Sequence, residues 1–463
     1  MAAGLALLLG ACSSTERDPG SNTGMGDAFA GVQEPGVLGP DGAGGPGTGT
    51  PGSLGPSGPG APIVALRDLP SAGITDTEIK VGVDDIHFEE IAGIPITRPP
   101  GRQWAEVVID DLNARGGVAG RRIVPFYYRY ESQTFLEREP AACAFYGEDA
   151  KVAVVIGQSF GHTPDFLACL AGHNILFIEG GRIDNDAETL DRFPLYANPN
   201  WMNMTRAARI LAPALVDQGF FGPGSVVGIL SDERPKYRRT TEIIVKGLAA
   251  RGVKVTKVVR MKLDQSSSLA DLQAQTSTAV LKMKSPPEAN RVIFWSSASF
   301  LFPGAAESQH YRPTYGMSTN DWPRTVMTWP GTVKEQLRGL KGVGWFPNED
   351  VSSPERWPAW DRCVALMIAA GLKWSDSNAE RGALVHCDLG WLLAAAGSRA
   401  GSRLTPATLL AGIEAVGGTF ESAAIPIASF GPGRHEGAVA VRDLAYFESC
   451  ECLRYTSAAR RAD

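Results

Sequence analysis

From residue 74 to residue 180, short apolar runs alternate with amphipathic stretches. The apolar runs predict strands at 79–83, 123–130, 152–157 and 175–179. Apolar residues spaced three or four apart predict helices at 101–114, around residue 143 and at 166–170. Because these strands are apolar throughout and are separated by helices, we expect parallel sheets covered by helices on both faces.

The same alternation restarts after Asn198-Pro199. It predicts helices at 202–218, 241–250 and 269–284, and strands at 226–230, 253–259 and 291–295. Residues 326–420 are mostly helical in pattern, with helices at 361–370, 381–396 and 405–416. Residues 425–430 and 438–447 flank a Gly-rich turn and predict an antiparallel pair. Two α/β series of this size predict an α/β protein of two lobes, the second beginning near residue 200.

The N-terminus has a different character. Ala2 to Leu9 form an apolar run that leads into Gly10-Ala11-Cys12 and then into polar residues, which resembles the end of a bacterial lipoprotein signal peptide. This resemblance implies that residues 1–12 are a signal segment and that Cys12 carries lipid. Residues 31–60 hold 12 Gly and 6 Pro, too little apolar surface to offset the entropy of ordering, so we expect 13–73 to be a disordered tether.

Charge and cysteines narrow the class of protein further. The net charge is −6 and no block of Lys or Arg stands out, which argues against a nucleic-acid partner. The six cysteines other than Cys12 indicate disulfides in an exported chain, in one of fifteen possible connectivities. The expected pairs are Cys143–Cys169, Cys363–Cys387 and Cys450–Cys452. The first two join neighbouring helical segments, the third needs a local turn, and we expect no metal and no cofactor.

Four stretches in this order resemble a known family. They are 73–82 (GITDTEIKVG), 112–123 (LNARGGVAGRRI), 155–159 (VIGQS), and 341–347 (KGVGWFP) followed by long helices and Leu404-Thr405-Pro406. The second ends a helix with glycines that allow a tight return into the next strand. Together they resemble the type I periplasmic binding proteins, specifically the branched-chain-amino-acid-type substrate-binding lipoproteins of ABC transporters. The likeness covers about residues 73–457.

The resemblance implies two doubly wound lobes with mostly parallel sheets, joined by a hinge of several crossovers. Lobe one would comprise 74–199 and 327–437, and lobe two 200–326 and 438–457. It also implies a function: an exported protein that is not an enzyme, anchored by lipid to the outer face of the cytoplasmic membrane. Such a protein would act as a monomer and deliver a small polar or amphipathic molecule to an ABC permease with its ATPase subunits.

A ligand of this family would lie between the lobes, beyond the carboxyl ends of the strands. The family places a hydroxyl that binds the ligand's carboxylate at the position of Ser159. The other candidates are polar or aromatic residues at strand ends and crossovers, namely Gln158, Phe160, His87, Phe88, Glu179, Gly180, Tyr196, Tyr237, Ser296 and Asn320.

One departure from the family weakens the expectation of an ordinary amino-acid ligand. Amino-acid binders carry hydroxyls at two lobe-one strand ends, whereas residues 179–182 (EGGR) contain none. A buried carboxylate with too few donors is costly. Two other functions stay open: a ligand-sensing receptor module of the same fold, and a serine hydrolase, because residues 157–161 match Gly-x-Ser-x-Gly and would use Ser159.

Overall fold

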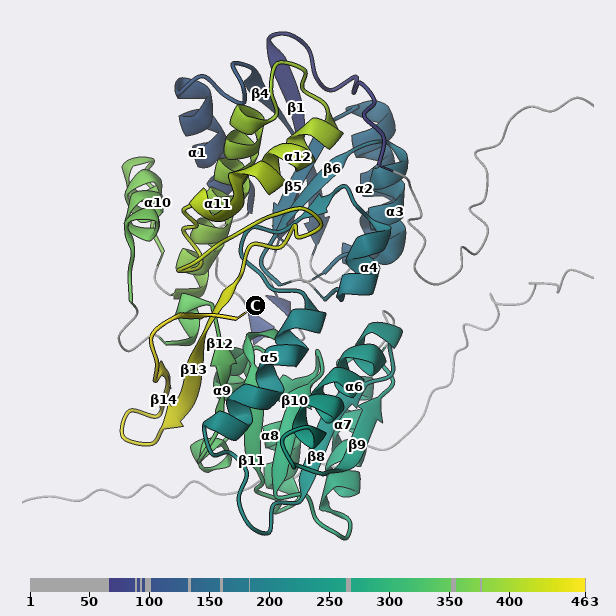
Figure 1. The fold of residues 1–463 in the computed structure, drawn as a ribbon, viewed down its shortest axis with the longest axis vertical. Helices are drawn as coiled ribbons and strands as arrows, with labels where there is room; N and C mark the ends of the chain where they lie inside the picture. The colour runs from purple at the N-terminus through teal and green to yellow at the C-terminus, as the bar shows by residue number, and fades with distance from the viewer. Residues whose placement is uncertain are drawn as a thin grey trace, which may run out of the picture. The chain divides into compact units, whose positions relative to one another are not determined.

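The computed structural model describes residues 66–87, 90–91, 94–95, 101–131, 135–158, 161–182, 184–263, 268–350, 355–374 and 377–462. Their strands form one five-stranded sheet and one eight-stranded sheet (Figure 1). A separate antiparallel pair joins β2 (Glu90–Ile91) and β3 (Ile94–Pro95). The mixed α/β class expected from the sequence is therefore confirmed.

The first sheet is parallel throughout, in the order β4-β1-β5-β6-β7. Its strands are β1 (Glu78–His87), β4 (Arg122–Glu131), β5 (Val154–Gln158), β6 (Leu176–Gly180) and β7 (Tyr196–Ala197). The four apolar runs of the first series became β1, β4, β5 and β6. Ile79, Val81 and Val155 are fully buried, as strands covered on both faces require.

Helices cover both faces of this sheet (Figure 1). One group consists of α1 (Gly101–Ala114), α11 (Ser377–Arg399) and α12 (Pro406–Val416), with α10 (Pro358–Ala369) packed on the outer side of α11 and α1. The other consists of α2 (Phe135–Ala144), α3 (Pro164–Gly172) and α4 (Ala187–Arg192). Helix α11 packs on β5 and β6, and it approaches α1 so closely that a Cβ on Gly382 would lie 2.5 Å from the Trp104 ring. Thr405 caps α12 and Pro406 opens it.

The second sheet has the order β14-β13-β12-β11-β10-β8-β9, with β15 beside β13. Its strands are β8 (Val227–Asp232), β9 (Val255–Met261), β10 (Arg291–Trp295), β11 (Thr314–Ser318), β12 (Lys341–Gly344), β13 (Ala440–Phe447), β14 (Cys452–Tyr455) and β15 (Arg460–Arg461). The strands from β9 to β12 pair in parallel, and β12, β13 and β14 pair antiparallel. The helices of this part are α5 (Met204–Asp217), α6 (Pro235–Ala249), α7 (Leu269–Lys284), α8 (Phe302–Ser308) and α9 (Pro323–Thr328).

The expected boundary at residue 327 is wrong, because β12 belongs to the second sheet. Lys341 to Val343 pair with β11, and β13 lies on the other side of β12. A Cβ on Gly342 would lie 2.0 Å from the Met317 carbonyl oxygen, so this close pairing requires glycine. The second lobe therefore keeps the chain through Gly344, and the return to the first lobe follows that residue.

The expected start of the folded part at residue 74 is also too late. Asp68 accepts a hydrogen bond from Thr405 Oγ1 (2.6 Å) and forms an ion pair with Arg403 (3.0 Å). The Leu69 carbonyl accepts a hydrogen bond from Asn174. These contacts place the segment before Ile74 on the first lobe, whereas the signal segment and most of the expected tether lie outside the described residues.

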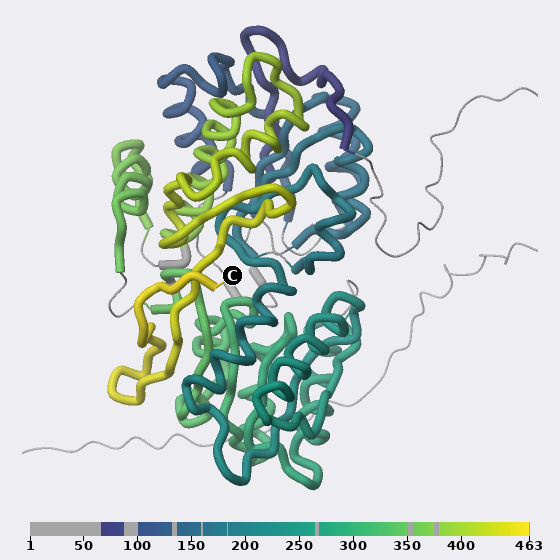
Figure 2. Tube along the Cα trace, in the orientation of Figure 1, coloured from purple at the N-terminus to yellow at the C-terminus, as the bar shows by residue number. Residues whose placement is uncertain are grey.

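Three passages of chain connect the two sheets: β7 to α5, β12 to α10, and the segment that leads into β13 (Figure 2). The first and the third lie side by side. Asn198 exchanges backbone hydrogen bonds with His435 and Gly437, and Ala438 donates to the Trp201 carbonyl. The several crossovers implied by the resemblance are therefore present, and two of them are paired through backbone hydrogen bonds.

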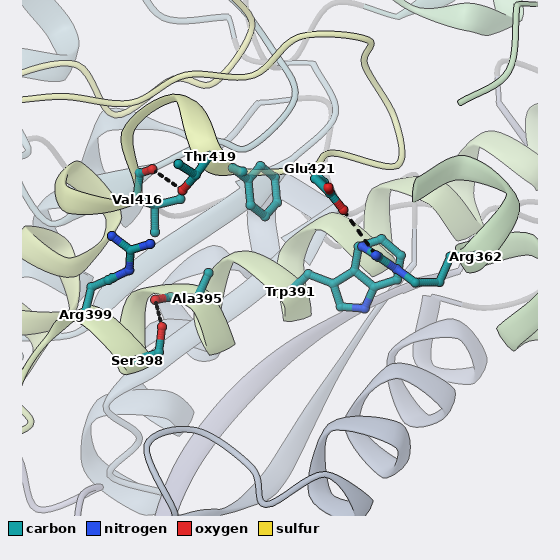
Figure 3. Close-up of a pocket in the computed structure, with 9 residues that line it drawn as sticks. Arg362, Trp391, Ala395, Ser398, Arg399, Val416, Thr419 and Glu421 are labelled. Carbon is teal, nitrogen blue, oxygen red and sulfur yellow. Dashed lines mark hydrogen bonds and ion pairs between the residues drawn. The ribbon is translucent and has the colours of Figure 1, made fainter. Parts of the chain in front are cut away.

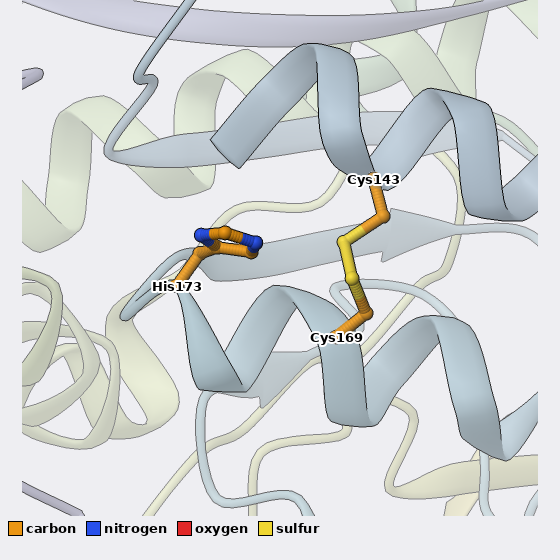
Figure 4. Close-up of side chains that lie close together, drawn as sticks. All are labelled: Cys143, Cys169 and His173. Carbon is orange, nitrogen blue, oxygen red and sulfur yellow. A yellow bond between two sulfur atoms is a disulfide. The ribbon is translucent and has the colours of Figure 1, made fainter. Parts of the chain in front are cut away.

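Three disulfides join the six cysteines as predicted, Cys143–Cys169, Cys363–Cys387 and Cys450–Cys452. The short one uses a turn in which Glu451 has φ 47°, and this turn brings the two Cα atoms to 5.1 Å. His173 lies beside the first disulfide, with its ring nitrogen and the two sulfurs within 4.8 Å of one another (Figure 4). Both sulfurs are in the disulfide, so they are not available as thiolate ligands.

Loss of the Cys143–Cys169 disulfide is expected to lower the free energy of unfolding by about 3 kcal/mol. The reason is that its loop, with a sequence separation of 26, restricts the unfolded chain. The measurement is denaturant unfolding of a Cys143→Ser, Cys169→Ser double variant against the wild type. A midpoint equal to that of the wild type, with an unchanged denaturant dependence, would show that the disulfide adds no stability.

None of the helices in the part of the chain that the structure describes is long and apolar enough to cross a bilayer.

Candidate ligand-binding site

The carboxyl ends of β1 and β5 lie next to each other in the first sheet, as the topology requires. His87, at the end of β1, lies 3.1 Å from Asp85 and is partly buried. Gln158 ends β5, and its Oε1 is buried without a hydrogen-bond partner among the described residues. Ser159, Phe160 and Phe88 lie outside the described residues, so their assignment to the site stays a prediction.

A buried histidine follows the β5 loop. His162 Nδ1 lies 2.9 Å from Glu139 Oε1, and Nε2 lies 3.2 Å from Asp84 Oδ2. Burial by itself would lower the pKa of His162, but hydrogen bonds to Asp84 and Glu139 outweigh it and raise the pKa to about 10. The imidazolium therefore joins β1, α2 and the segment that begins α3. Gly157 makes room for this arrangement, since a Cβ there would lie 2.4 Å from Asp84 Oδ2.

The end of β6 is held by the first crossover. Glu179 is fully buried and accepts a hydrogen bond from Tyr196, so these two predicted site residues contact each other. Gly180 faces α11, where a Cβ would lie 2.3 Å from Val385. Gly181 has φ 82°, donates to Asn200 (2.9 Å) and accepts from Asn198 (3.1 Å). This turn fixes the direction in which Arg182 leaves the strand.

Tyr237, predicted to contribute from the second lobe, contacts the first. It lies in α6 and is buried, with its hydroxyl donating to Asp184 Oδ1 and accepting from Arg182 Nη2 (3.0 Å). Asp184 also lies 3.0 Å from Arg234 Nη1 and 3.2 Å from Lys236 Nζ. Burial alone would raise the pKa of Asp184, but Lys236, Arg234 and Arg182 hold it well below its usual range.

We call this group, Arg182, Asp184, Arg234, Lys236 and Tyr237, the Asp184 network. It joins the segment after β6 to the first turn of α6, and therefore the strand ends of the first sheet to those of the second. Arg234 extends it to Asp232 at the end of β8 (2.6 Å) and to Ser297 after β10 (2.9 Å).

A second group gathers aromatic rings around two guanidinium groups. Arg381 near the start of α11 lies over the rings of Trp322 (4.9 Å), Phe346 (4.6 Å) and Trp201 (5.8 Å). The Arg182 guanidinium lies 5.5 Å from the centre of the same Trp322 ring. Desolvation lowers the pKa of Arg381 to about 10 despite Glu349, and Arg324 and Arg182 act in the same direction. Arg381 is therefore charged at neutral pH.

Asn320 and Ser296, the other predicted residues of the second lobe, lie at the same strand ends. Asn320 accepts a hydrogen bond from Trp201 Nε1 (2.7 Å). Ser296 follows β10, and its hydroxyl oxygen accepts from the Ala298 N–H (3.3 Å). The rings of Trp345 and Phe346 pack against Trp201, with centres 5.6 and 4.8 Å from the centre of the Trp201 ring. We call the set Arg182, Trp201, Asn320, Trp322, Trp345, Phe346 and Arg381 the arginine–tryptophan cluster.

A surface pocket of about 260 Å³ lies elsewhere, over α11 and α12 (Figure 3). Arg362 lines it and lies 4.3 Å from the centre of the Trp391 ring and 3.3 Å from Glu421. The pocket includes none of the predicted site residues.

Four histidines that the hydrolase alternative could use make other contacts in the structure. His386 Nδ1 lies 2.8 Å from the Gly382 carbonyl oxygen, and His435 lies 2.8 Å from Glu414. His162 is held by two carboxylates, and His173 lies beside a disulfide.

The fold is that of the type I periplasmic binding proteins, and its neighbours among solved structures are substrate-binding proteins of ABC transporters. The chain is similar to such a protein from Desulfitobacterium hafniense in complex with Leu (17% identity, TM-score 0.56, 82% of this chain and 99% of that chain covered). It is similar to a fatty acid ABC transporter substrate-binding protein from Thermomonospora curvata (13% identity, TM-score 0.60, 85% and 95% covered). It is also similar to a solute-binding protein from R. palustris in complex with 4-hydroxybenzoate (14% identity, TM-score 0.60, 83% and 97% covered). No family model and no curated protein matches the sequence.

Proposed function

We propose that this chain is an extracytoplasmic solute-binding protein that delivers a small polar or amphipathic molecule to an ABC importer. The observation that carries the proposal is the Asp184 network, which links the strand ends of two α/β units that the hinge segments connect. A ligand drives closure only if it contacts both units, because a ligand held by one alone does not distinguish the open state from the closed state. We expect Arg182, which follows β6, to contact the ligand from the first unit and Tyr237, in α6, to contact it from the second.

The solved neighbours support the role and leave the ligand open. Their descriptions name Leu, 4-hydroxybenzoate and fatty acid as ligands or cargo of proteins with this fold. The chemical class of this chain's ligand therefore has to be inferred from the chain's own side chains.

The test of the function is calorimetry over a metabolite library, followed by X-ray scattering on each compound that binds. A ligand should reduce the radius of gyration of the protein. Tyr237→Ala and Ser159→Ala should each lower the affinity for that ligand. A tightly bound ligand that leaves the radius of gyration unchanged, and whose affinity is the same in both variants as in the wild type, would show that binding takes place elsewhere.

We further propose that Cys12 carries a lipid anchor that holds the protein at the outer face of the membrane, with the segment behind it as a tether. Several acyl chains, at about 0.8 kcal/mol per buried CH2, give stable anchoring where one chain is marginal. Cys12→Ala is therefore expected to move the protein from the membrane fraction to the soluble fraction of a matched expression host. Complete retention of this variant in the membrane fraction would contradict the anchor.

A further inference from the structure

Four buried nitrogen atoms of the arginine–tryptophan cluster have no hydrogen-bond partner among the residues that the structure describes. They are Arg182 Nε, Arg381 Nε, Asn320 Nδ2 and Trp345 Nε1. All four are donors. Leaving a buried donor unpaired costs about 1–3 kcal/mol, so four in one cluster call for acceptor atoms from outside the chain.

The cluster also carries positive charge that the neighbouring carboxylates do not fully balance. Two neighbouring acids, Asp321 and Glu349, already accept hydrogen bonds: Asp321 from Ser318, and Glu349 from Thr319 (3.0 Å) and Tyr455 (2.7 Å). Burial raises the pKa of each to about 7, although these hydrogen bonds oppose it, so neither is fully ionised at neutral pH. Asp184 lies 3.6 Å from Arg182 but is shared with Arg234 and Lys236.

Aromatic rings form the apolar part of the cluster. Trp201, Trp345 and Phe346 are buried, whereas Trp322 is partly exposed and holds a left-handed backbone conformation at φ 56°. Such a conformation is costly for a bulky residue and is often found at ligand contacts. Both guanidinium groups lie within 5.5 Å of this one ring. The cluster thus combines the flat apolar surfaces of aromatic rings with positively charged hydrogen-bond donors.

Resting on the proposed function, we infer that the arginine–tryptophan cluster binds a small aromatic carboxylic acid, with its carboxylate against Arg182 and Arg381 and its ring among the tryptophans. Guanidinium groups match a carboxylate in geometry and charge. The unpaired atoms of this cluster include no acceptor for an ammonium group, so the cluster does not provide what an α-amino acid needs. Residues 179–182 lack a hydroxyl, and Arg182 takes over the donor role.

The test compares three probes of one shape on the full chain: benzoate, neutral benzamide and cationic benzylamine. Calorimetry should show benzoate binding at least about tenfold more tightly than either of the others, because only benzoate forms charge-assisted hydrogen bonds. This comparison needs no variant and does not depend on the folding of one.

Substitution then locates the probe. Arg381→Gln is expected to weaken benzoate about ten- to one-hundredfold, and Trp322→Leu is expected to weaken benzoate and benzamide alike, because it removes ring contact. The matched control is Arg362→Gln, which removes an arginine stacked on a tryptophan in the surface pocket and should leave benzoate affinity unchanged. Thermal unfolding of each variant checks its fold.

Each result separates this inference from the proposed function. Benzamide or benzylamine binding as tightly as benzoate, or benzoate binding that ignores Arg381→Gln, would overturn the aromatic-acid assignment. If benzoate does not bind while another library compound binds and reduces the radius of gyration, the aromatic-acid assignment is wrong and the solute-binding function stands. If no compound binds, both fail.

Discussion

Replacing His162 with glutamine is expected to lower the free energy of unfolding by about 3–5 kcal/mol. The substitution removes a buried positive charge and leaves Asp84 and Glu139 buried without it. The ring also packs against Phe166 and Phe177, with centres 4.4 and 4.9 Å apart. Denaturant unfolding monitored by circular dichroism measures the loss.

The control is His173→Gln, which changes an exposed histidine of the same region and should alter stability by no more than about 0.5 kcal/mol. Equal stability of the His162 and His173 variants would show that the two carboxylates do not need the imidazolium. In that case the raised pKa of His162 would have no energetic consequence.

The contacts of His162 with Asp84 and Glu139 also predict how the free energy of unfolding depends on pH. The pKa of His162 is raised from 6.5 to about 10 in the folded protein, so its stabilising contribution is complete below pH 6.5 and is lost as the pH rises through about 10. The difference in unfolding free energy between the wild type and His162→Gln should therefore shrink between these pH values. A constant difference across the window would contradict a charged His162.

The strands of both sheets were predictable wherever they are continuous apolar runs. β10 and α7 have the predicted bounds, 291–295 and 269–284, because apolar periodicity and a capping box at Ser268 mark them clearly. β12 was missed as a strand and placed in the wrong lobe, since its four residues include two glycines. Its position is fixed by pairing with β11 and β13, which are distant in sequence and leave no local signal.

The candidate site was predictable in part for the same reason. Strand ends can be read from local pattern, and Tyr237 at the start of α6 was named as a candidate in that way. Arg182 and Arg381 are almost 200 residues apart, and only the folded chain brings both to Trp322. The signal that was available is the missing hydroxyl at 179–182, which pointed to an unusual ligand but not to the arginine that replaces it.

Replacing Asp184 with alanine is expected to disfavour the closed state of the ligand-bound protein by about 3–5 kcal/mol, on the order of a hundredfold or more in population. The substitution removes the carboxylate that Arg234 (3.0 Å) and Lys236 (3.2 Å) share, and it leaves their charges facing Arg182. These groups face one another only when the segment after β6 lies against α6. X-ray scattering should therefore show a larger radius of gyration for the variant than for the wild type.

The matched control is Asp217→Ala, which breaks an exposed ion pair with Arg251 (2.9 Å) and should leave the radius unchanged, because exposed pairs contribute little. The pH dependence provides an independent check. Since the pKa of Asp184 is depressed below 3.8, its contribution is fully present above that value and is lost only as the pH falls through the lower folded pKa. The wild type should thus stay compact at pH 5. An Asp184→Ala protein as compact as the wild type at pH 7 would show that the Asp184 network does not hold the two units together.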